Sequence, residues 1–539
     1  MKPTPRSVCC LLYFALLAAA LAHAQLPHFQ HIIIVIQENR TPDNLFGGTP
    51  GNPVFEPGVD IQQANGAVPW CLGACFTAKH SHDAWKTMWN NGNWNNGQGA
   101  CSILVTDYCT QNGVRTTCNG QPAPPLPSCA PQSYVSTSYD NSVVAPYFDI
   151  ARKYGFANYF FQTNQGPSFP AHQFLFSGTS APNGVAGQTD YQYFASSNGT
   201  DGIGKVGCNG PNNSKVKVVN EQSNEDVLAR VRPCFNHFSL PTLLDNSLTS
   251  WKYYASSENS WATSIWTAPN SLVPICLPRT YDNQCSGYDW VNYVVHGPSD
   301  ILTDLAQPTC GLKNVSWVIP NEPWADHPGF QHGETDSGDI EGGPVWVANI
   351  INTLGFSGCT DRINNQDVPY WQDTAVFITW DDWGGWWDHV PPYVVRFEDH
   401  NTNHCNPAQQ FGCGFTSGFR VPLLVVSAYT TPGYVSGNTQ TQGGEVFPYV
   451  HDFGSILAFI ENNFTLGIGS INPAYPFADA FAPDYLQGVN VPLSDFFPLS
   501  TAYPRPFQAI TLPQGAHDAS YYGAYTGTGD PDNDVVDND

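Results

Sequence analysis

The residues best suited to chemistry in this sequence are carboxylate and amide side chains that directly follow short apolar runs. Two such runs, residues 31–36 and 374–379, are closely followed by Glu38, Asn39, Asp381 and Asp382. Hard divalent cations bind carboxylate and amide oxygens, so these four side chains could form one coordination shell. A single acid after a strand is more often a helix cap or a turn residue. Two pairs in equivalent positions favour a metal site.

A second chemical feature is the segment Gly166-Pro167-Ser168-Phe169-Pro170. Hydrolysis of a phosphate ester can proceed in two steps when a hydroxyl first accepts the phosphoryl group, provided that the pKa of the hydroxyl is lowered. Pro170 can set the first turn of a short helix, which would leave Ser168 near the positive helix N-terminus. On this segment alone, a simple Ser N-cap is the easier interpretation.

The elements that must position these residues are short apolar strands alternating with helices. We expect strands at residues 31–36, 315–319, 374–379 and 421–427, and helices at 240–248, 344–354 and 453–462. This alternation predicts an α/β fold with a mostly parallel sheet covered by helices on both faces. Ligands bind at the carboxyl ends of the strands in such sheets. The run 315–319 leads to Asp326-His327, which would bring an imidazole to the same edge.

The N-terminal 24 residues are typical of a secretory signal peptide. Lys2 and Arg6 precede an apolar run that ends in Ala22-His23-Ala24, and this run is too short to span a bilayer. We therefore expect secretion to the extracellular space or the periplasm. Residues 25–514 are expected to form a single catalytic domain with long loops at 86–132 and 181–225, and residues 515–539 an acidic, disordered tail.

The number of cysteines bears on the cellular compartment, and the net charge bears on the class of binding partner. Sixteen cysteines include two in the signal, and the even remainder predicts disulfides in an exported protein, with Cys71–Cys75 and Cys405–Cys413 as possible pairs. The formal net charge is −25 and becomes more negative when the signal is removed. Nucleic acid is therefore not an expected partner, because phosphate backbones are bound by Lys and Arg clusters.

Six segments occur in the order found in the bacterial phosphoesterase family that includes secreted phospholipases C and acid phosphatases: QENRTPDNLFGG, GPSFPAHQFLFSGTS, ADHP, FITWDDWGGWWDHVPP, FRVPLLVVSAY and DFGSILAFIE. The chain resembles this family, and plant non-specific phospholipases C, over about residues 31–464. The resemblance implies an alkaline-phosphatase-like fold with Ser168 as the nucleophile. It also implies metal ligation by Glu38, Asn39, Asp381, Asp382 and the Ser168 oxygen, and phosphate contacts from His80 and His327.

Two positions depart from the pattern of that family. Ala171 stands where many members of the superfamily have an Asn that can donate to phosphate, so one oxyanion donor must come from elsewhere. Phe453 stands where related sequences often have His, and His451 is two positions away. We therefore expect one divalent metal ion, of unidentified element, rather than two.

The expected function is a secreted, metal-dependent phosphoric ester hydrolase that resembles phospholipase C and acts through a phosphoserine intermediate. His327 would serve as general acid or charge stabiliser. The substrate is expected to be a phosphate ester such as a phospholipid, with at most transient contact with a membrane surface. An acid phosphatase acting on small soluble phosphomonoesters is the alternative, and an exported binding protein without turnover is a third interpretation. A sulfatase is disfavoured because the helix lacks the Arg of the Cys/Ser-x-Pro-x-Arg motif.

Four tryptophans bear on the choice of substrate: Trp380, Trp383, Trp386 and Trp387. Aromatic faces can hold a quaternary ammonium such as choline by cation–π attraction. Large aromatic side chains more often pack in cores, and packing is the preferred interpretation here.

Overall fold

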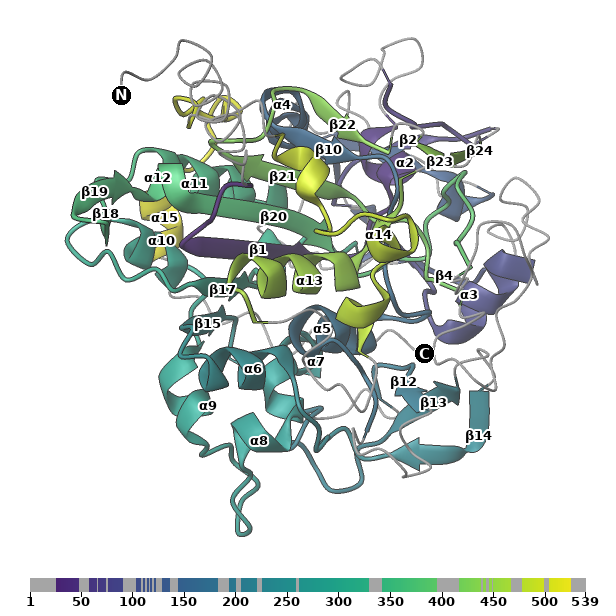
Figure 1. The fold of residues 1–539 in the computed structure, drawn as a ribbon. Coiled ribbons are helices and arrows are strands. Elements are labelled where there is room, and N and C mark those ends of the chain that lie inside the picture. The colour runs from purple at the N-terminus through teal and green to yellow at the C-terminus, as the bar shows by residue number, and fades with distance from the viewer. Residues whose placement is uncertain are drawn as a thin grey trace, which may run out of the picture.

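The computed structural model describes residues 26–524, with shorter breaks and with longer gaps at 48–57, 91–102, 136–143, 183–192, 329–341, 395–415 and 467–476. Its centre is an eight-stranded sheet in the order β16-β15-β17-β1-β20-β21-β10-β22 (Figure 1). The strands are β1 (His31–Gln37), β10 (Gly155–Ala157), β15 (Trp251–Tyr254), β16 (Val294–Val295), β17 (Val315–Val318), β20 (Thr374–Trp380), β21 (Leu423–Ser427) and β22 (Tyr434–Ser436).

The sheet is mostly parallel, which confirms the predicted α/β class. β1 pairs in parallel with β17 on one side and with β20 on the other. β21, the strand expected at residues 421–427, belongs to the same sheet but runs antiparallel to β20 and β10. Gln37 and Trp380 are partners in the β1–β20 register, so the residues that follow these two strands leave the sheet side by side.

Helices cover both faces of this sheet. Phe377 of β20 packs on Phe459 of α13 (Phe453–Asn463), with ring centroids 5.2 Å apart. Trp380 of the same strand packs on Tyr147 of α4 (Ala145–Lys153), at 5.1 Å. Because residues three apart in a strand point to opposite faces, α13 and α4 lie on opposite sides of the sheet.

Further helices join these two layers. The helix with Ser168, α5 (Ser168–Ser177), contacts α13, and α11 (Gly343–Gly355) contacts α4. The other α-helices are α2 (Pro42–Phe46), α3 (His82–Trp89), α6 (Leu240–Asn246), α7 (Trp261–Trp266), α8 (Val273–Cys276), α9 (Tyr288–Tyr293), α10 (Asp300–Leu305), α12 (Tyr370–Asp373), α14 (Pro483–Leu486) and α15 (Ala519–Ala524). No helix in the described ranges is long and apolar enough to cross a bilayer.

The expectation of loops at residues 181–225 is wrong in part. A three-stranded antiparallel sheet forms there from β12 (Tyr193–Ala195), β13 (Val216–Asn220) and β14 (Glu225–Val231). Val216 and Val218 are buried whereas Lys217 between them is partly exposed. This is the period-two pattern of a half-buried strand, which the high content of Asn and Gly in the surrounding sequence obscures.

The predicted tail begins too early at residue 515. The helix α15 (Ala519–Ala524) lies inside that range, and its Tyr522 is fully buried. The Tyr522 ring packs on Trp324 and Trp346, with centroids 4.9 and 5.1 Å away. The ordered fold therefore extends at least to residue 524, whereas residues 525–539 and the predicted signal at 1–24 lie outside the described residues.

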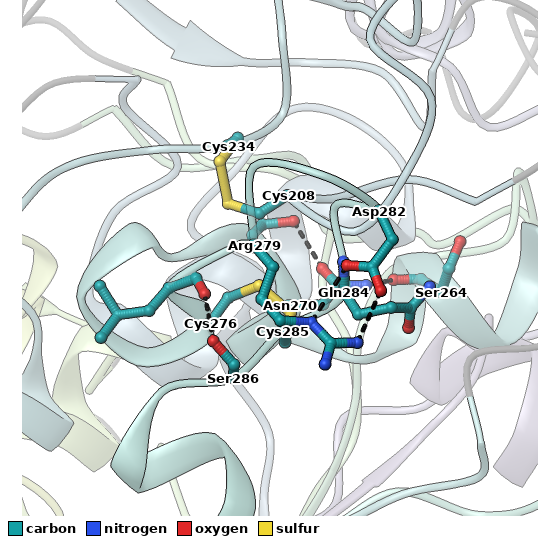
Figure 2. The surroundings of a disulfide bond; sticks show 12 residues. Cys208, Cys234, Ser264, Asn270, Cys276, Arg279, Asp282, Gln284, Cys285 and Ser286 are labelled. Carbon is teal, nitrogen blue, oxygen red and sulfur yellow. Dashed lines mark hydrogen bonds and ion pairs between the residues drawn. A yellow bond between two sulfur atoms is a disulfide. The ribbon is translucent and has the colours of Figure 1, made fainter.

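Disulfides are present, as the exported character predicts. The structure contains the pairs Cys208–Cys234, Cys276–Cys285 and Cys310–Cys359, and Figure 2 shows the first two. Cys71 is also disulfide-bonded, as is Cys129. Three cysteines of the proposed pairs, Cys75, Cys405 and Cys413, fall in ranges that the structure does not describe.

Candidate active site

Ser168 lies where the ends of β1 and β20 meet the first turn of α5. Its Oγ is 3.4 Å from Glu38 Oε2 and 3.4 Å from Asp382 Oδ2, and all three side chains are buried. Glu38 directly follows β1, and Asp382 lies two residues beyond β20. The structure thus brings the predicted nucleophile to the predicted acids at the carboxyl edge of the sheet.

The loops that follow β1 and β20 are bonded to each other. Asn39 has a left-handed backbone with φ of 60°, a conformation that Asn tolerates better than most residues, and its N–H donates to Asp381 Oδ1 at 3.0 Å. Gly384 has a φ of 61°, and a Cβ there would lie 2.6 Å from the Asn39 carbonyl oxygen. A glycine is required at this close approach of the two loops.

His80 orients the amide of Asn39. The Nδ1–H of His80 donates to the Ala78 carbonyl oxygen at 2.9 Å, because a carbonyl oxygen can only accept. His80 Nε2 then accepts from Asn39 Nδ2 at 3.3 Å. This leaves Asn39 Oδ1 buried without a hydrogen-bond partner among the described residues, and the same holds for Asp381 Oδ2.

The electrostatics of this cluster fit a bound cation. Burial, followed by the charges of Asp381 and Asp382, raises the pKa of Glu38 well above its ordinary value. Unpaired buried carboxylates and amide oxygens lose free energy on leaving water. A hard divalent metal ion would compensate this loss, and the donors that could hold it are Glu38, Asn39, Asp381, Asp382 and the Ser168 oxygen.

His172 also belongs to this site, and sequence reasoning missed it. Its Nε2 is 3.0 Å from Glu38 Oε1 and 3.8 Å from Asp381 Oδ2, and one ligand atom from each of these three residues lies within 4.8 Å of the others. Burial lowers the pKa of His172 to about 4, so the ring is neutral, and its Nε2–H can donate to ionised Glu38. The i, i+4 spacing from Ser168 on a helix was the available signal.

The two histidines expected near phosphate lie close to each other. The ring centroids of His80 and His327 are 6.1 Å apart, and His80 Nε2 is 4.0 Å from Asp382 Oδ2. His327 Nδ1 is 2.7 Å from the Pro328 carbonyl oxygen and must donate to it. The hydrogen bond from Nδ1 therefore fixes the orientation of the His327 ring.

Asp326, which precedes His327, is anchored by the strands and helices around it. Arg40 donates to its carbonyl oxygen through Nε at 3.0 Å and Nη2 at 2.7 Å. The Asp326 carboxylate accepts from Tyr147 Oη at 2.8 Å and Trp380 Nε1 at 2.9 Å, and burial raises its pKa to about 6. Arg40, which follows Glu38 and Asn39 after β1, thus helps to position the backbone that carries His327.

The departure at Phe453, with His451 two positions away, also has a structural counterpart. His451 is bonded to Asp484 Oδ1 and Ser436 Oγ, each at 2.8 Å, in a separate buried cluster. Phe453 packs on the Phe160 ring at 5.8 Å. These two side chains therefore contribute to packing and to a polar network. They do not belong to the Ser168 cluster, which consists of Ser168, Glu38, Asn39, His172, Asp381 and Asp382.

The four tryptophans near the acidic pair are all buried, at 0–6% exposure. Trp386 donates to the Asn39 carbonyl oxygen at 3.0 Å and its ring already carries the Arg40 guanidinium at 5.3 Å. Trp383 donates to Met88 Sδ at 3.2 Å. These contacts favour the packing interpretation over a choline-binding surface.

Comparison with known proteins places this site in a family. The chain is 21% identical over 467 residues to the hemolytic phospholipase C of Pseudomonas aeruginosa, covering 82% of this chain and 54% of that protein. It is 29% identical over 162 residues to the non-hemolytic phospholipase C of Burkholderia pseudomallei, covering 28% and 19%. It is also 29% identical over 202 residues to non-specific phospholipase C6 of Arabidopsis thaliana, covering 37% and 33%.

The chain thus spans about half or less of the length of these relatives. Among solved structures, an alkaline phosphatase superfamily protein from Vibrio parahaemolyticus aligns over 62% of each chain, with 9% identity and a TM-score of 0.28. The model of the Phosphoesterase family matches residues 29–467, which include every residue of the Ser168 cluster, and the chain belongs to the Phosphoesterase family.

Proposed function

We propose that this protein is a metal-dependent phosphoric ester hydrolase of the phospholipase C type, with Ser168 as its nucleophile. The observation that carries the proposal is the position of Ser168 Oγ, 3.4 Å from both Glu38 and Asp382 at the start of a buried helix. Membership of the Phosphoesterase family supports the class of bond that is cleaved, and the names of the relatives support a phospholipid substrate.

In the proposed reaction, Ser168 Oγ attacks phosphorus in line with the departing alcohol. The Oγ–P bond forms while the bond from phosphorus to the alcohol oxygen breaks, and water later cleaves the phosphoserine. One divalent ion bound by Glu38, Asn39, Asp381 and Asp382 would lower the pKa of the Ser168 hydroxyl and neutralise phosphoryl charge. The Ser168 hydroxyl already donates towards Glu38 Oε2 and Asp382 Oδ2, which favours loss of its proton in that direction.

The two histidines have distinct proposed tasks. Protonated His327 would donate from Nε2 to the departing alkoxide and, once neutral, would accept a proton from the attacking water. The Asp326 anchor supports this task because it holds the backbone next to the ring. His80 would contact phosphate from beside the metal ligands, a position supported by its bond to Asn39.

Secretion and the extent of the domain are parts of the same proposal. The disulfides support an oxidising compartment, outside the cell or in the periplasm. We take residues 25–524 as one catalytic domain, with a substrate that is a phosphate ester and with at most transient contact with a membrane surface. The burial of the four tryptophans weakens the case for a choline headgroup and keeps a phosphomonoesterase as the second candidate.

The proposal is tested by hydrolysis assays on the purified protein with and without a chelator. Chelation and Ser168→Ala should each abolish turnover, and Ser177→Ala at the other end of the same helix should retain it. Release of phosphocholine from phosphatidylcholine vesicles identifies a phospholipase C, whereas release of phosphate from an aryl phosphate alone identifies the phosphomonoesterase. Unchanged turnover of Ser168→Ala would refute the proposed nucleophile, and no turnover of either substrate would favour the binding protein.

A further inference from the structure

A second group of ligand-type side chains lies at the opposite ends of the same two central strands. His31 is the first residue of β1, and Asp373 immediately precedes β20. Asp361 belongs to β18 (Thr360–Ile363), which forms a hairpin with β19 (Gln366–Pro369). β1 has seven residues, so this group lies roughly 20 Å from the Ser168 cluster.

The geometry of His31 is that of a metal ligand. Its Nδ1 lies 2.9 Å from the Lys313 carbonyl oxygen, which can only accept, so Nδ1 carries a proton. The other ring nitrogen, Nε2, lies 2.6 Å from Asp361 Oδ2 and can act as a metal ligand whenever it carries no proton. Metal-binding histidines commonly donate their other ring N–H to a backbone carbonyl in this way.

The buried carboxylate of Asp373 is a second reason to expect a bound ion at this place. It is only 3% exposed, and neither oxygen of its carboxylate has a hydrogen-bond partner in the described part of the chain. One ligand atom from each of His31, Asp361 and Asp373 lies within 4.8 Å of the other two. A buried carboxylate beside another carboxylate is costly unless something positive lies between them.

Either a proton or a metal ion could compensate this charge, and the proton has two possible positions. A proton on His31 Nε2 would serve Asp361 but would leave the Asp373 oxygens without a donor. A proton shared by the two carboxylates is the other possibility, since burial and the charge of Asp361 raise the pKa of Asp373 to about 8. A divalent cation compensates both carboxylates and the Nε2 lone pair at once.

We propose that His31, Asp361 and Asp373 bind a divalent transition metal ion such as Zn²⁺. One imidazole nitrogen and two carboxylates suit Zn²⁺ or Mn²⁺ better than Ca²⁺, which prefers oxygen alone. The side chain of Asp361 is 30% exposed, so solvent can reach the site and water can complete the coordination. The ion would join the β18–β19 hairpin to the two central strands.

The surroundings hold two of the three ligands in place. The Cys310–Cys359 disulfide lies immediately before β18 and fixes the start of the hairpin that carries Asp361. The Tyr370 ring packs edge-on against His31 at 4.7 Å. Little rearrangement is therefore needed when the ion binds, which favours affinity.

The test uses the full mature chain with Asp381→Asn and Asp382→Asn, which removes two ligands from the candidate metal cluster around Ser168. After treatment with a chelator, this background protein should bind about one Zn²⁺ per chain, measured by elemental analysis after gel filtration. Zn²⁺ at about 100-fold excess over Kd should raise Tm by about 2–5 °C. Asp373→Asn in the same background should weaken Zn²⁺ binding by at least the roughly tenfold loss typical of an outer-shell change, and should remove the rise in Tm.

Two controls keep the test decisive. Asp367→Asn, on the exposed part of the same hairpin, should bind Zn²⁺ as the background does. Metal-free Asp373→Asn should be at least as stable as the metal-free background, because a neutral amide relieves the repulsion from Asp361. If Asp373→Asn does not fold, the partly exposed Asp361→Asn gives the same test. Equal Zn²⁺ binding by variant and background, or no response of Tm to Zn²⁺ and Mn²⁺, refutes the site and leaves a proton as its occupant.

Discussion

Single residues decide what the Ser168 cluster can bind. Glu38, Asp381 and Asp382 are fully buried, and each loses hydration free energy unless a donor or a cation replaces water. His172 compensates part of this lost hydration by donating one N–H to Glu38. Asn39 Oδ1 and Asp381 Oδ2 remain without hydrogen-bond partners in the described structure, and a bound cation would compensate both.

His172 should control metal affinity more than the chemical step. His172→Ala removes the donor that orients Glu38, and we expect the metal concentration for half-maximal activity to rise about 10–100-fold. Turnover should recover at saturating metal. His172→Gln, whose amide can still donate, should lie between the variant and the parent protein. An unchanged metal requirement in His172→Ala would show that Glu38 does not depend on this hydrogen bond.

Asn198 can supply the amide donor that is missing at Ala171. Its Oδ1 accepts from the Phe169 N–H at 2.8 Å, next to Ser168, while its buried Nδ2 has no partner among the described residues. We expect Asn198→Ala to lower kcat by about 10²-fold, the cost of losing one oxyanion donor.

A comparison of two substitutions separates this role from simple helix capping. Asn198→Asp keeps the acceptor for the Phe169 N–H but lacks the amide donor, so it should recover the thermal stability that Asn198→Ala loses and should not recover kcat. Recovery of kcat by Asn198→Asp would mean that Asn198 only caps the helix.

The sequence signalled some of these residues and not others. Ser168, the pair Glu38-Asn39 and the pair Asp381-Asp382 could be recognised because each begins or closely follows a predictable helix or strand. His172 was within reach through its helical spacing from Ser168. Asn198 was not, because it lies 29 residues along the chain from Phe169 and only the folded backbone brings the two together.

At the scale of elements, β1 and β20 set the positions of most of the site. Their β-branched, fully buried residues predict central parallel strands, and their register places Glu38 beside Asp381. The direction of β21 was not predictable, because an apolar run looks the same in either orientation. The sheet formed by β12, β13 and β14 was missed because the high content of Asn and Gly around these strands predicts loops. The alternating pattern of buried and exposed residues there is too short to override that prediction.

A buried ionic cluster also ties elements that are distant in sequence. Arg420 binds Asp43 at 3.0 Å, after β1, and Asp388 at 3.0 Å, after β20. His389 Nδ1 lies 2.7 Å from Asp43 Oδ2 and its Nε2 lies 3.0 Å from Asp60 Oδ1. This cluster stabilises the same two loops that carry the site acids.

His389 gives this cluster a predictable pH dependence. Burial opposes its charged form, but hydrogen bonds to Asp43 and Asp60 outweigh burial and raise the pKa of His389 to about 9. Because the folded-state pKa lies above the ordinary value of about 6.5, the stabilisation is complete below pH 6.5 and is lost as pH rises through 9.

We therefore expect His389→Gln to lower the free energy of unfolding by about 1–3 kcal/mol at pH 6, allowing for solvent screening. The difference from the parent should shrink towards pH 10 in urea unfolding curves. His28→Gln, at an exposed position, is the matched control and should show no such trend. A constant difference between pH 6 and pH 10 would show that His389 is neutral in the folded protein.

At the scale of the whole molecule, the central sheet lies between two clusters of ligand-type side chains. The cluster at the carboxyl ends of β1 and β20 is rich in oxygen donors and contains Ser168, which suits chemistry on phosphate esters. The cluster at their other ends combines one imidazole with two acids and draws its residues from the strand starts and the β18–β19 hairpin. Occupancy of the second cluster should therefore affect stability first.

The C-terminal boundary of the molecule gives the last prediction. Tyr522 of α15 packs against both Trp324 and Trp346, which also contact each other, and Trp324 lies two residues before Asp326. Deletion of residues 515–539 removes this buried aromatic ring and should cost about 3 kcal/mol or more, seen as a fall in Tm. It should also lower turnover, because the backbone before His327 loses its support.

Deletion of residues 525–539 alone is the matched control and should leave both Tm and turnover unchanged. Tyr522→Ala in the full chain should reproduce most of the longer deletion, whereas Tyr521→Ala, on the partly exposed side of α15, should not. If neither deletion changes Tm or turnover, the helix contributes nothing to the domain, and the boundary expected at residue 514 is the functional one.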